Sequence, residues 1–282
     1  MALPANVTTV VRTALDEDIG AADLTAQLIP VSARAVANII CRESAILCGT
    51  AWFEATFLEL DDNCVVSWSQ RDGESVEPNK MVCRVEGSAR ALVTGERTAL
   101  NFLQTLSGTA TTTRRYVEKL AGTTAALLDT RKTIPSLRSA QKYAVRCGGG
   151  KNHRMGLFDG ILIKENHIEA VGSITEAIRQ MRSLFADRPI EIEVETIVEF
   201  TEAITAGADI VLLDNFSIDA LKQAVALANG RVQLEASGGF EFADIRAIAE
   251  TGVNFVSVGA LTKHLQAIDF SMRFHRGPPH PH

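Results

Sequence analysis

From residue 125 onward the sequence repeats one unit, in which a short aliphatic and β-branched run bounded by Gly, Asp or Asn precedes a stretch with helical spacing of apolar residues. The six runs span residues 125–130, 160–164, 190–196, 209–215, 232–237 and 255–261. The helical patterns between them span residues 137–146, 174–185, 197–206, 218–228 and 242–250. Because strands that alternate with helices pair in parallel through right-handed crossovers, this pattern predicts a parallel α/β sheet.

Six such strands can close toward a small barrel or lie open as a doubly wound sheet. No GxGxxG motif follows the first run, which removes the best sign of an open sheet that binds a dinucleotide. We therefore predict a small, incomplete six-stranded α/β barrel in residues 109–265.

Residues 1–108 carry a different pattern and are predicted to form an N-terminal α+β domain. Strand-like segments lie at 32–47, 65–68 and 81–85, and helical patterns lie at 51–60 and 91–106. After Gly108 a further helical pattern, 109–120, joins this domain to the barrel. We expect the C-terminal segment, 266–282, to pack back on this domain. Its Pro-rich end is expected to be mobile, and its histidines are not expected to form a metal site.

Charge and composition exclude several classes of protein. The 282 residues carry a formal net charge of −6, which argues against a nucleic-acid binder. No apolar run approaches the roughly 20 residues of a membrane helix, and the start lacks a signal-peptide pattern, so we expect a cytoplasmic protein without membrane contact. Five cysteines without a CxxC pair indicate free thiols in a reducing compartment.

Polar residues or glycines follow every predicted barrel strand, at the end where barrel enzymes place their active sites. They are Asp129-Thr130-Arg131-Lys132-Thr133, Lys164-Glu165-Asn166-His167, Glu193 with Glu195, Asp214-Asn215, Ser237-Gly238-Gly239 and Gly259-Ala260-Leu261. Ordinary turn and cap chemistry explains one such end, but six in succession indicate a functional site.

Basic residues are concentrated between positions 131 and 164, where eight Lys or Arg residues accompany one acidic residue. A solvated helix face at 137–146 accounts for Arg138, Lys142 and Arg146, which are spaced by four. The residues that follow strands are different, because they point into the barrel mouth. There they predict an anionic ligand, and arginine suits bidentate binding of carboxylate or phosphate.

Two further features of the mouth suggest a phosphorylated substrate. The glycines of Ser237-Gly238-Gly239 and Gly259-Ala260 expose backbone N–H groups in consecutive loops, which is typical of a barrel phosphate site. Glu193 and Asp214 end adjacent strands among the basic residues. They pair either with Lys132 or Lys164, or with Mg²⁺ and sugar hydroxyls, and we favour the second interpretation.

Seven motifs, in order from residue 14 to about residue 262, resemble those of the quinolinate phosphoribosyltransferase family. They are Ala14-Leu15-Asp16-Glu17-Asp18-Ile19-Gly20 with Asp23 and Thr25, Gly95-Glu96-Arg97-Thr98-Ala99-Leu100-Asn101-Phe102, Asp129-Thr130-Arg131-Lys132-Thr133, Gly149-Gly150-Lys151-Asn152-His153-Arg154, Leu213-Asp214-Asn215-Phe216, Ala236-Ser237-Gly238-Gly239 and Ser257-Val258-Gly259-Ala260-Leu261.

The resemblance implies an Mg²⁺-dependent enzyme of NAD biosynthesis that has no organic cofactor. It would convert quinolinate and 5-phosphoribosyl 1-pyrophosphate into nicotinate mononucleotide, pyrophosphate and carbon dioxide. The resemblance also implies an N-terminal open sandwich and a homodimer whose sites lie between subunits, with Arg97 contributed by the partner.

The resemblance assigns roles to individual residues. Four side chains would clamp the quinolinate carboxylates: Arg97, Arg131, His153 and Arg154. The catalytic group would be Lys132, Lys164, Glu193 and Asp214, with the two carboxylates holding Mg²⁺ directly or indirectly. The other substrate-binding residues would be Thr130, Ser237, Gly238, Gly239, Gly259 and Ala260. Glu195 is a reserve candidate, and His167 and His264 have no assigned role.

Three other functions compete with this assignment. A lysine at a strand end, such as Lys164, can form a Schiff base in an aldolase. The same barrel could serve as a phosphate-ligand sensor without catalysis. A related transferase could use another heterocyclic base without decarboxylation, although a basic clamp for two carboxylates argues against it.

Overall fold

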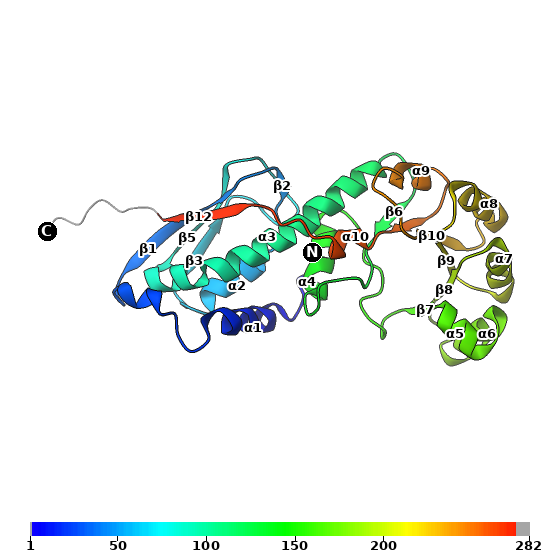
Figure 1. Ribbon diagram of the computed structural model, residues 1–282, viewed down its shortest axis with the longest axis horizontal. Coiled ribbons are helices and arrows are strands. Elements are labelled where there is room, and N and C mark those ends of the chain that lie inside the picture. The colour runs from blue at the N-terminus through cyan, green and yellow to red at the C-terminus, as the bar shows by residue number, and fades with distance from the viewer. Residues whose placement is uncertain (1, 275–282) are drawn as a thin grey trace. The chain divides into compact units, whose positions relative to one another are not determined.

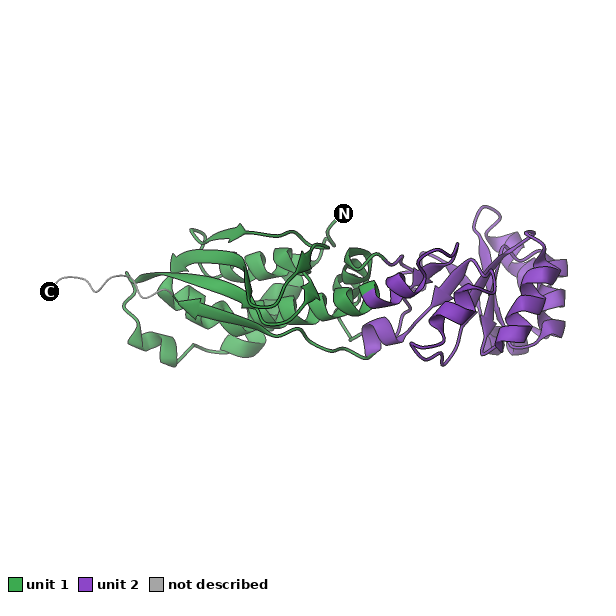
Figure 2. Ribbon diagram, turned by 90° about the horizontal axis from the view of Figure 1, so that it is seen from above, with its two compact units in different colours: residues 1–114, 134–149, 264–282 green, residues 115–133, 150–263 purple. Residues whose placement is uncertain are grey.

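The computed structural model describes residues 2–274, so the C-terminal histidines of the sequence lie outside the described residues. The chain divides into two compact units, coloured separately in Figure 2. Unit 1 comprises residues 1–114, 134–149 and 264–282, and unit 2 comprises residues 115–133 and 150–263.

Unit 2 contains the six predicted strands, paired in parallel in the order β6-β11-β10-β9-β8-β7 (Figure 1). Their bounds are β6 (Ala126–Leu128), β7 (Ile161–Ile163), β8 (Ile190–Val194), β9 (Ile210–Asp214), β10 (Gln233–Ser237) and β11 (Phe255–Ser257). The helices of this unit are α5 (Glu165–Val171), α6 (Ile174–Leu184), α7 (Ile197–Ala206), α8 (Ile218–Ala228), α9 (Ile245–Ala249) and α10 (Ala260–Lys263). Hydroxyl side chains of Ser173, Thr196 and Ser217 cap α6, α7 and α8, which explains where these three helices begin.

The sheet of unit 2 is an incomplete barrel, as predicted. β6 and β7 are its two edge strands, and no pairing between them occurs within the described part of the chain. Thr130 follows β6 and Lys164 follows β7, yet both line the same cavity as Asp214 from β9. The sheet therefore curves so that its two edges approach a common mouth.

Unit 1 is built on a four-stranded antiparallel sheet in the order β12-β1-β5-β3. Its strands are β1 (Arg34–Cys41), β3 (Val65–Trp68), β5 (Lys80–Ser88) and β12 (Phe270–Phe274), and a second sheet pairs β2 (Ala45–Ile46) with β4 (Ser75–Val76). The helices are α1 (Val7–Ile19), the 3-10 helix η1 (Thr25–Leu28), α2 (Thr50–Leu58), most of α3 (Ala89–Lys119) and α4 (Arg138–Cys147). Alternate residues of β1, Ala37 and Ile39, share one core with Phe53 of α2 and Leu100 of α3, so these helices cover one face of the sheet.

Gly108 does not separate two helices, contrary to the expected break, because α3 runs through it from Ala89 to Lys119. A Cβ atom at Gly108 would lie 2.2 Å from the backbone oxygen of Gln266. The glycine is therefore explained by the close passage of the segment that leads to β12.

α4 was expected as a crossover helix of the barrel, and this expectation was wrong. Its residues Tyr143 and Ala144 pack with Trp52 and Leu106 in a core of unit 1. Lys142, expected on a solvated face, is completely buried. The repeat of strand and helix indicates that a helix follows the strand, but it does not indicate which of the two compact units contains that helix.

None of the helices between residues 2 and 274 combines the length and apolar composition that a bilayer crossing requires.

Candidate active site

A cavity of about 220 Å³ lies at the C-terminal ends of the unit 2 strands. It is lined by Thr130, Arg131, Lys132, His153, Arg154, Leu162, Lys164, Glu193, Leu212, Asp214, Glu235, Ser237 and Ser257. Every strand of the sheet, or the segment directly after it, contributes to this lining. The cavity is therefore the barrel mouth that the sequence predicts.

Most of the predicted site residues meet in this cavity. Thr130, Arg131, Lys132, His153, Arg154, Lys164, Glu193, Asp214 and Ser237 all line it. The remaining predicted residues, Arg97, Gly238, Gly239, Gly259 and Ala260, do not belong to its lining.

The basic side of the cavity brings two guanidinium groups together. Burial lowers the pKa of Arg154, and the nearby charge of Arg131 lowers it further. The Arg154 side chain is fixed by donation from Nη1 to the backbone oxygen of Gly160 at 3.2 Å. Because the charges of Arg131 and Arg154 repel each other, an anionic ligand would stabilise both guanidinium groups.

Lys132 is held by its own loop. Its backbone N–H donates to Oγ1 of Thr130 at 3.0 Å, and its carbonyl accepts from Oγ1 of Thr262 at 2.7 Å. A Cβ atom at Gly259 would lie 3.0 Å from Cδ of Lys132, so this glycine leaves room for the lysine stem.

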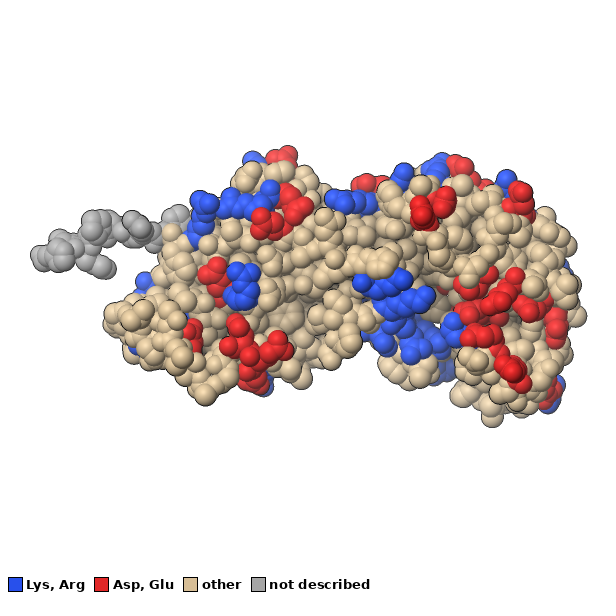
Figure 3. All heavy atoms as spheres, in the orientation of Figure 1, with Lys and Arg blue, Asp and Glu red and all other residues tan. Residues whose placement is uncertain are grey.

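The acidic side of the cavity consists of Glu193 and Asp214. Glu193 forms an ion pair with Lys164, and Oδ2 of Asp214 accepts from Nδ2 of Asn215 at 2.8 Å. Burial raises the pKa of Glu193, the Lys164 ammonium opposes that rise, and the charge of Asp214 adds to it. Acidic side chains also gather on the face of unit 2 shown in Figure 3, with basic side chains beside them.

The sequence left two kinds of partner open for these carboxylates, a lysine or Mg²⁺ with sugar hydroxyls. The lysine pairing is present for Glu193. Two carboxylates on the neighbouring strands β8 and β9 also supply the oxygen donors that Mg²⁺ prefers.

His153 is positioned through its backbone and both ring nitrogens. Its backbone N–H donates to Oδ1 of buried Asp129 at 2.9 Å, and Asn152 donates to Oδ2 of the same carboxylate at 2.5 Å. The ring Nδ1 accepts from the backbone N–H of Arg154 at 2.7 Å. The ring Nε2 lies 3.1 Å from Oε2 of Glu191. With Nδ1 as an acceptor, Nε2 carries the ring proton that faces this carboxylate.

Two buried glutamates were missed in the sequence: Glu191, which lies against His153, and Glu235, which lines the cavity. Only 6% and 2% of their surfaces are exposed. Burial raises the pKa of Glu235 to about 8, the charge of Glu191 adds to the rise, and His153 opposes it. The alternation of side chains in strands places both residues on the same strand face as predicted site residues. Each lies two positions before a predicted site residue, Glu193 on β8 and Ser237 on β10.

The glycine loop after β10 is organised by Asn215. Gly238 has a φ of +142°, and a Cβ atom there would lie 2.6 Å from Oδ1 of Asn215. The backbone N–H of Gly239 donates to the same oxygen at 3.2 Å. This N–H therefore already has a protein acceptor, and phosphate binding by the loop stays a prediction.

The other candidates lie outside the cavity. Arg97 is exposed on α3 in unit 1, and His264 is exposed in the same unit. Glu195 is exposed, and its backbone N–H donates to Glu199 at the start of α7. His167 caps α5 by accepting from the backbone N–H of Lys164 at 2.9 Å. His167 thus has a structural role that explains its place after the strand.

Comparisons with known proteins identify the family. Residues 23–107 match the model of the quinolinate phosphoribosyl transferase N-terminal domain, and residues 109–273 match that of the C-terminal domain. A relative from Bacillus subtilis (strain 168), "Probable nicotinate-nucleotide pyrophosphorylase [carboxylating]", is 42% identical over 257 residues, which cover 91% of this chain and 89% of the relative. "Quinolinate phosphoribosyltransferase [decarboxylating] 1b" from Nicotiana tabacum is 36% identical over 285 residues, which cover 94% of this chain and 81% of the relative.

The structure of the nicotinate-nucleotide pyrophosphorylase from Francisella tularensis has the same fold, with a TM-score of 0.94 and 47% sequence identity. This similarity covers 97% of the present chain and 98% of the Francisella chain. The two domain models together match nearly all of the described residues, in agreement with the motifs around the cavity. The chain therefore belongs to the quinolinate phosphoribosyl transferase family.

Proposed function

We propose that this protein is a decarboxylating quinolinate phosphoribosyltransferase of NAD biosynthesis. Quinolinate and 5-phosphoribosyl 1-pyrophosphate would give nicotinate mononucleotide, pyrophosphate and carbon dioxide in the presence of Mg²⁺. One observation carries the proposal: a single cavity combines Arg131 and Arg154 with the carboxylates of Glu193 and Asp214. The names of the relatives support the same reaction.

Quinolinate is a dianion, and the basic side of the cavity suits it. Arg131 and Arg154 each offer a planar fork that can bind one carboxylate through two parallel hydrogen bonds. His153 lines the same cavity, and its ring is held in place by Glu191 and by the backbone of Arg154. The exposed position of Arg97 on α3 is compatible with a role in the site of a second subunit, in a homodimer.

Transfer of the ribosyl group develops positive charge on the sugar ring as pyrophosphate departs. Glu193 and Asp214 would stabilise that charge, and Lys132 and Lys164 would stabilise the departing pyrophosphate. Mg²⁺, when bound by the carboxylates and the substrate oxygens, would supply charge neutralisation on the pyrophosphate. The ion pair of Lys164 and Glu193 holds both side chains at the cavity.

Decarboxylation follows from the product of the transfer. The ring nitrogen becomes cationic once it carries the ribose, so it stabilises the carbanion left on the adjacent carbon when carbon dioxide departs. The substrate thus supplies its own electron sink, and no organic cofactor is needed. A cytoplasmic location stays a prediction from the sequence.

The aldolase alternative is disfavoured by the environment of Lys164. A Schiff-base lysine must lose its proton to attack a carbonyl. The Lys164 side chain is instead engaged in an ion pair with the Glu193 carboxylate.

One assay tests the proposal. The purified protein is supplied with 5-phosphoribosyl 1-pyrophosphate, Mg²⁺ and either carboxyl-labelled quinolinate or nicotinate, and labelled carbon dioxide and mononucleotide are measured. We expect equal amounts of carbon dioxide and mononucleotide from quinolinate and little turnover of nicotinate. Turnover of nicotinate alone would identify the related transferase. If neither acceptor gave a mononucleotide, the proposal that the protein is this enzyme would be rejected.

A further inference from the structure

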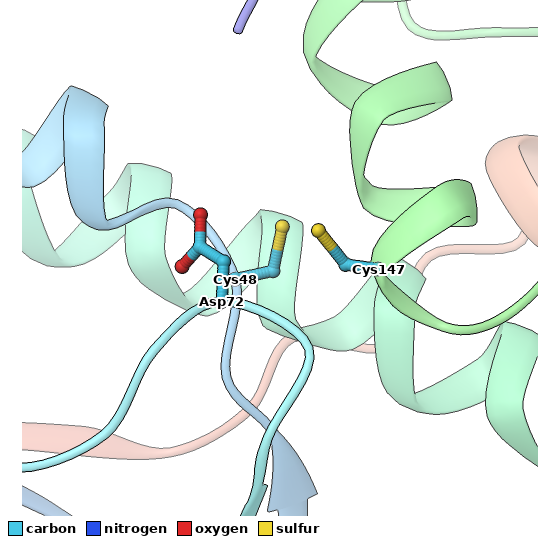
Figure 4. A group of neighbouring side chains, drawn as sticks. All are labelled: Cys48, Asp72 and Cys147. Atoms are coloured by element: carbon cyan, nitrogen blue, oxygen red, sulfur yellow. The ribbon is translucent and has the colours of Figure 1, made fainter. Parts of the chain in front are cut away.

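Two cysteines and one aspartate meet inside unit 1, outside the candidate active site. Cys48 directly precedes the N-cap of α2, Asp72 lies in the segment between β3 and β4, and Cys147 is the last residue of α4. One ligand atom from each side chain lies within 4.8 Å of the others. Figure 4 shows the two sulfur atoms pointing toward one another, with the Asp72 carboxylate beside Cys48.

The two cysteine segments are both fixed against helix α3. Oγ of Ser107 accepts from the backbone N–H of Cys48 at 3.0 Å and donates to its carbonyl oxygen at 3.1 Å. Gly148, the residue after Cys147, lies against the following two turns of α3. Nε of Arg114 donates to the carbonyl oxygen of Gly148 at 2.9 Å, and a Cβ atom at Gly148 would lie 2.5 Å from the backbone oxygen of Ala110.

Asp72 is also fixed, because its two oxygens have separate donors. The Tyr143 hydroxyl donates to Oδ2 at 2.9 Å, and the backbone N–H of Thr50 donates to Oδ1 at 3.2 Å. Tyr143 lies one turn before Cys147 on α4. The carboxylate therefore links the segment of Cys48 to the helix of Cys147.

We propose that Cys48 and Cys147 are an oxidisable dithiol pair that a peroxide converts into a disulfide. The sulfur atom of Cys147 attacks one peroxide oxygen, the O–O bond breaks, and the departing oxygen takes up a proton to leave as water. This step gives a sulfenic acid on Cys147. The sulfur atom of Cys48 then attacks the sulfur of Cys147, the S–O bond breaks, and the hydroxide leaves as water with the Cys48 proton. In total two thiols are oxidised, and one peroxide is reduced to two molecules of water.

The order of the two steps follows from the environments of the thiols. A hydrogen bond from Cys48 lowers the pKa of Cys147, whereas burial raises the pKa of Cys48. Cys147 also retains a small exposed fraction, 3%, while Cys48 has none. We therefore assign Cys147 as the thiol that the peroxide oxidises and Cys48 as the thiol that resolves the product.

The experiment treats the full-length protein with hydrogen peroxide and then blocks the remaining thiols with an alkylating reagent. Trypsin is expected to cut after Arg42, Arg71, Arg146 and Lys151. We expect a crosslinked species made of peptides 43–71 and 147–151, with the loss of two hydrogen atoms relative to the separate peptides. Dithiothreitol should return both peptides to their thiol forms. Because peptide 43–71 also contains Cys64, fragmentation must place the link on Cys48.

Variants provide the matched comparison. Cys48→Ser and Cys147→Ser should each abolish the crosslink, whereas Cys83→Ala, which changes a cysteine that is also buried, should retain it. If a variant does not fold, peptide mapping of the peroxide-treated parent protein is sufficient to test the proposal. The proposal is overturned if the folded protein gives no 48–147 crosslink, if the link joins Cys64 instead, or if Cys147 proceeds to sulfinic acid with Cys48 still free.

Discussion

Glu191 and Glu235 each place a carboxylate oxygen close to the same atom, Nε2 of His153, at 3.1 and 3.6 Å. Burial raises the pKa of Glu235, and the charge of the neighbouring Glu191 adds to this rise because two close carboxylates are costly to ionise together. The folded protein therefore holds a proton on this group at pH values where the unfolded chain has released it.

The free energy of unfolding should depend on pH through Glu235. The unfolded-state pKa of a glutamate is about 4.3. Because the folded-state pKa of Glu235 is higher, about 8, unfolding releases a proton between these values. The stabilisation is complete below pH ~4.3, falls as pH rises through this window, and is lost above the folded-state pKa.

Glu235→Gln should remove this pH dependence, so the free energy of urea unfolding should differ less between pH 5.5 and pH 8.5 in the variant than in the parent. The exposed control Glu241→Gln should keep the parent's dependence. An identical pH profile in Glu235→Gln would show that Glu235 does not hold the proton.

Arg131→Lys should weaken quinolinate binding although it keeps the charge. An ammonium cannot make two parallel hydrogen bonds to one carboxylate. A charge-assisted hydrogen bond contributes roughly 1.5 to 3 kcal/mol, so the dissociation constant should rise about 10-fold to 150-fold. Isothermal titration calorimetry measures it, with Arg179→Lys on the exposed surface of α6 as the control. Unchanged quinolinate affinity would remove Arg131 from the proposed clamp.

Asp214→Asn should lower kcat by roughly 100-fold or more while the protein stays folded. The amide keeps the shape of the side chain but removes a charge that stabilises the transition state more than the ground state. Steady-state kinetics and the Tm together check this, with the exposed Asp219→Asn of α8 as the control. Activity within about 3-fold of the parent, under roughly 0.7 kcal/mol, would mean that Asp214 only ends its strand.

Arg97→Ala and Arg131→Ala should complement each other if Arg97 serves the site of a partner subunit. The two inactive variants are unfolded, mixed equally and refolded. In a hybrid dimer the Arg97→Ala subunit has an intact cavity and receives Arg97 from its partner, while the other site carries both defects. Random pairing makes about half the dimers hybrid, so activity should return to about a quarter of the parent value. A mixture that contains hybrids but stays inactive would contradict this arrangement.

Gly108→Ala should destabilise unit 1 in spite of the better helix propensity of alanine. The new Cβ would meet the backbone oxygen of Gln266, which cannot move away by a rotamer change. Overpacking costs about 1 to 3 kcal/mol, against a gain in helix propensity of about 1 kcal/mol. Urea denaturation should therefore show a net loss of up to about 2 kcal/mol, while Asn101→Ala, exposed on the same helix, should show none. A more stable Gly108→Ala protein would show that the segment at 266 yields easily.

The barrel was predictable from the sequence because each of its strands is a separate aliphatic run with turn residues at its ends. The strand 209–215, for example, corresponds to β9 within one residue at each end. α5 was not predicted, because it is short and has no buried residue that would create a helical pattern. α4 was predicted as a helix but assigned to the wrong compact unit. Its apolar face packs against residues far away in the sequence, such as Trp52.

The cavity was predictable to the extent that its residues end strands. Arg131, Lys164 and Asp214 were identified in this way, because strand ends converge on one mouth. Glu191 and Glu235 lie two residues before the strand-end residues Glu193 and Ser237. Their burial and their approach to His153 depend on the curvature of the sheet, which no local pattern of residues specifies.

Strand β12 has a consequence for biosynthesis. It pairs with β1 in unit 1, although all of unit 2 lies between these strands in the sequence. A ribosome therefore releases β1, β3 and β5 long before the strand that covers the free edge of β1. Until then that edge exposes unpaired backbone groups, which can pair with other chains. Nascent chains that stall within unit 2 should thus be the form of this protein most prone to aggregate.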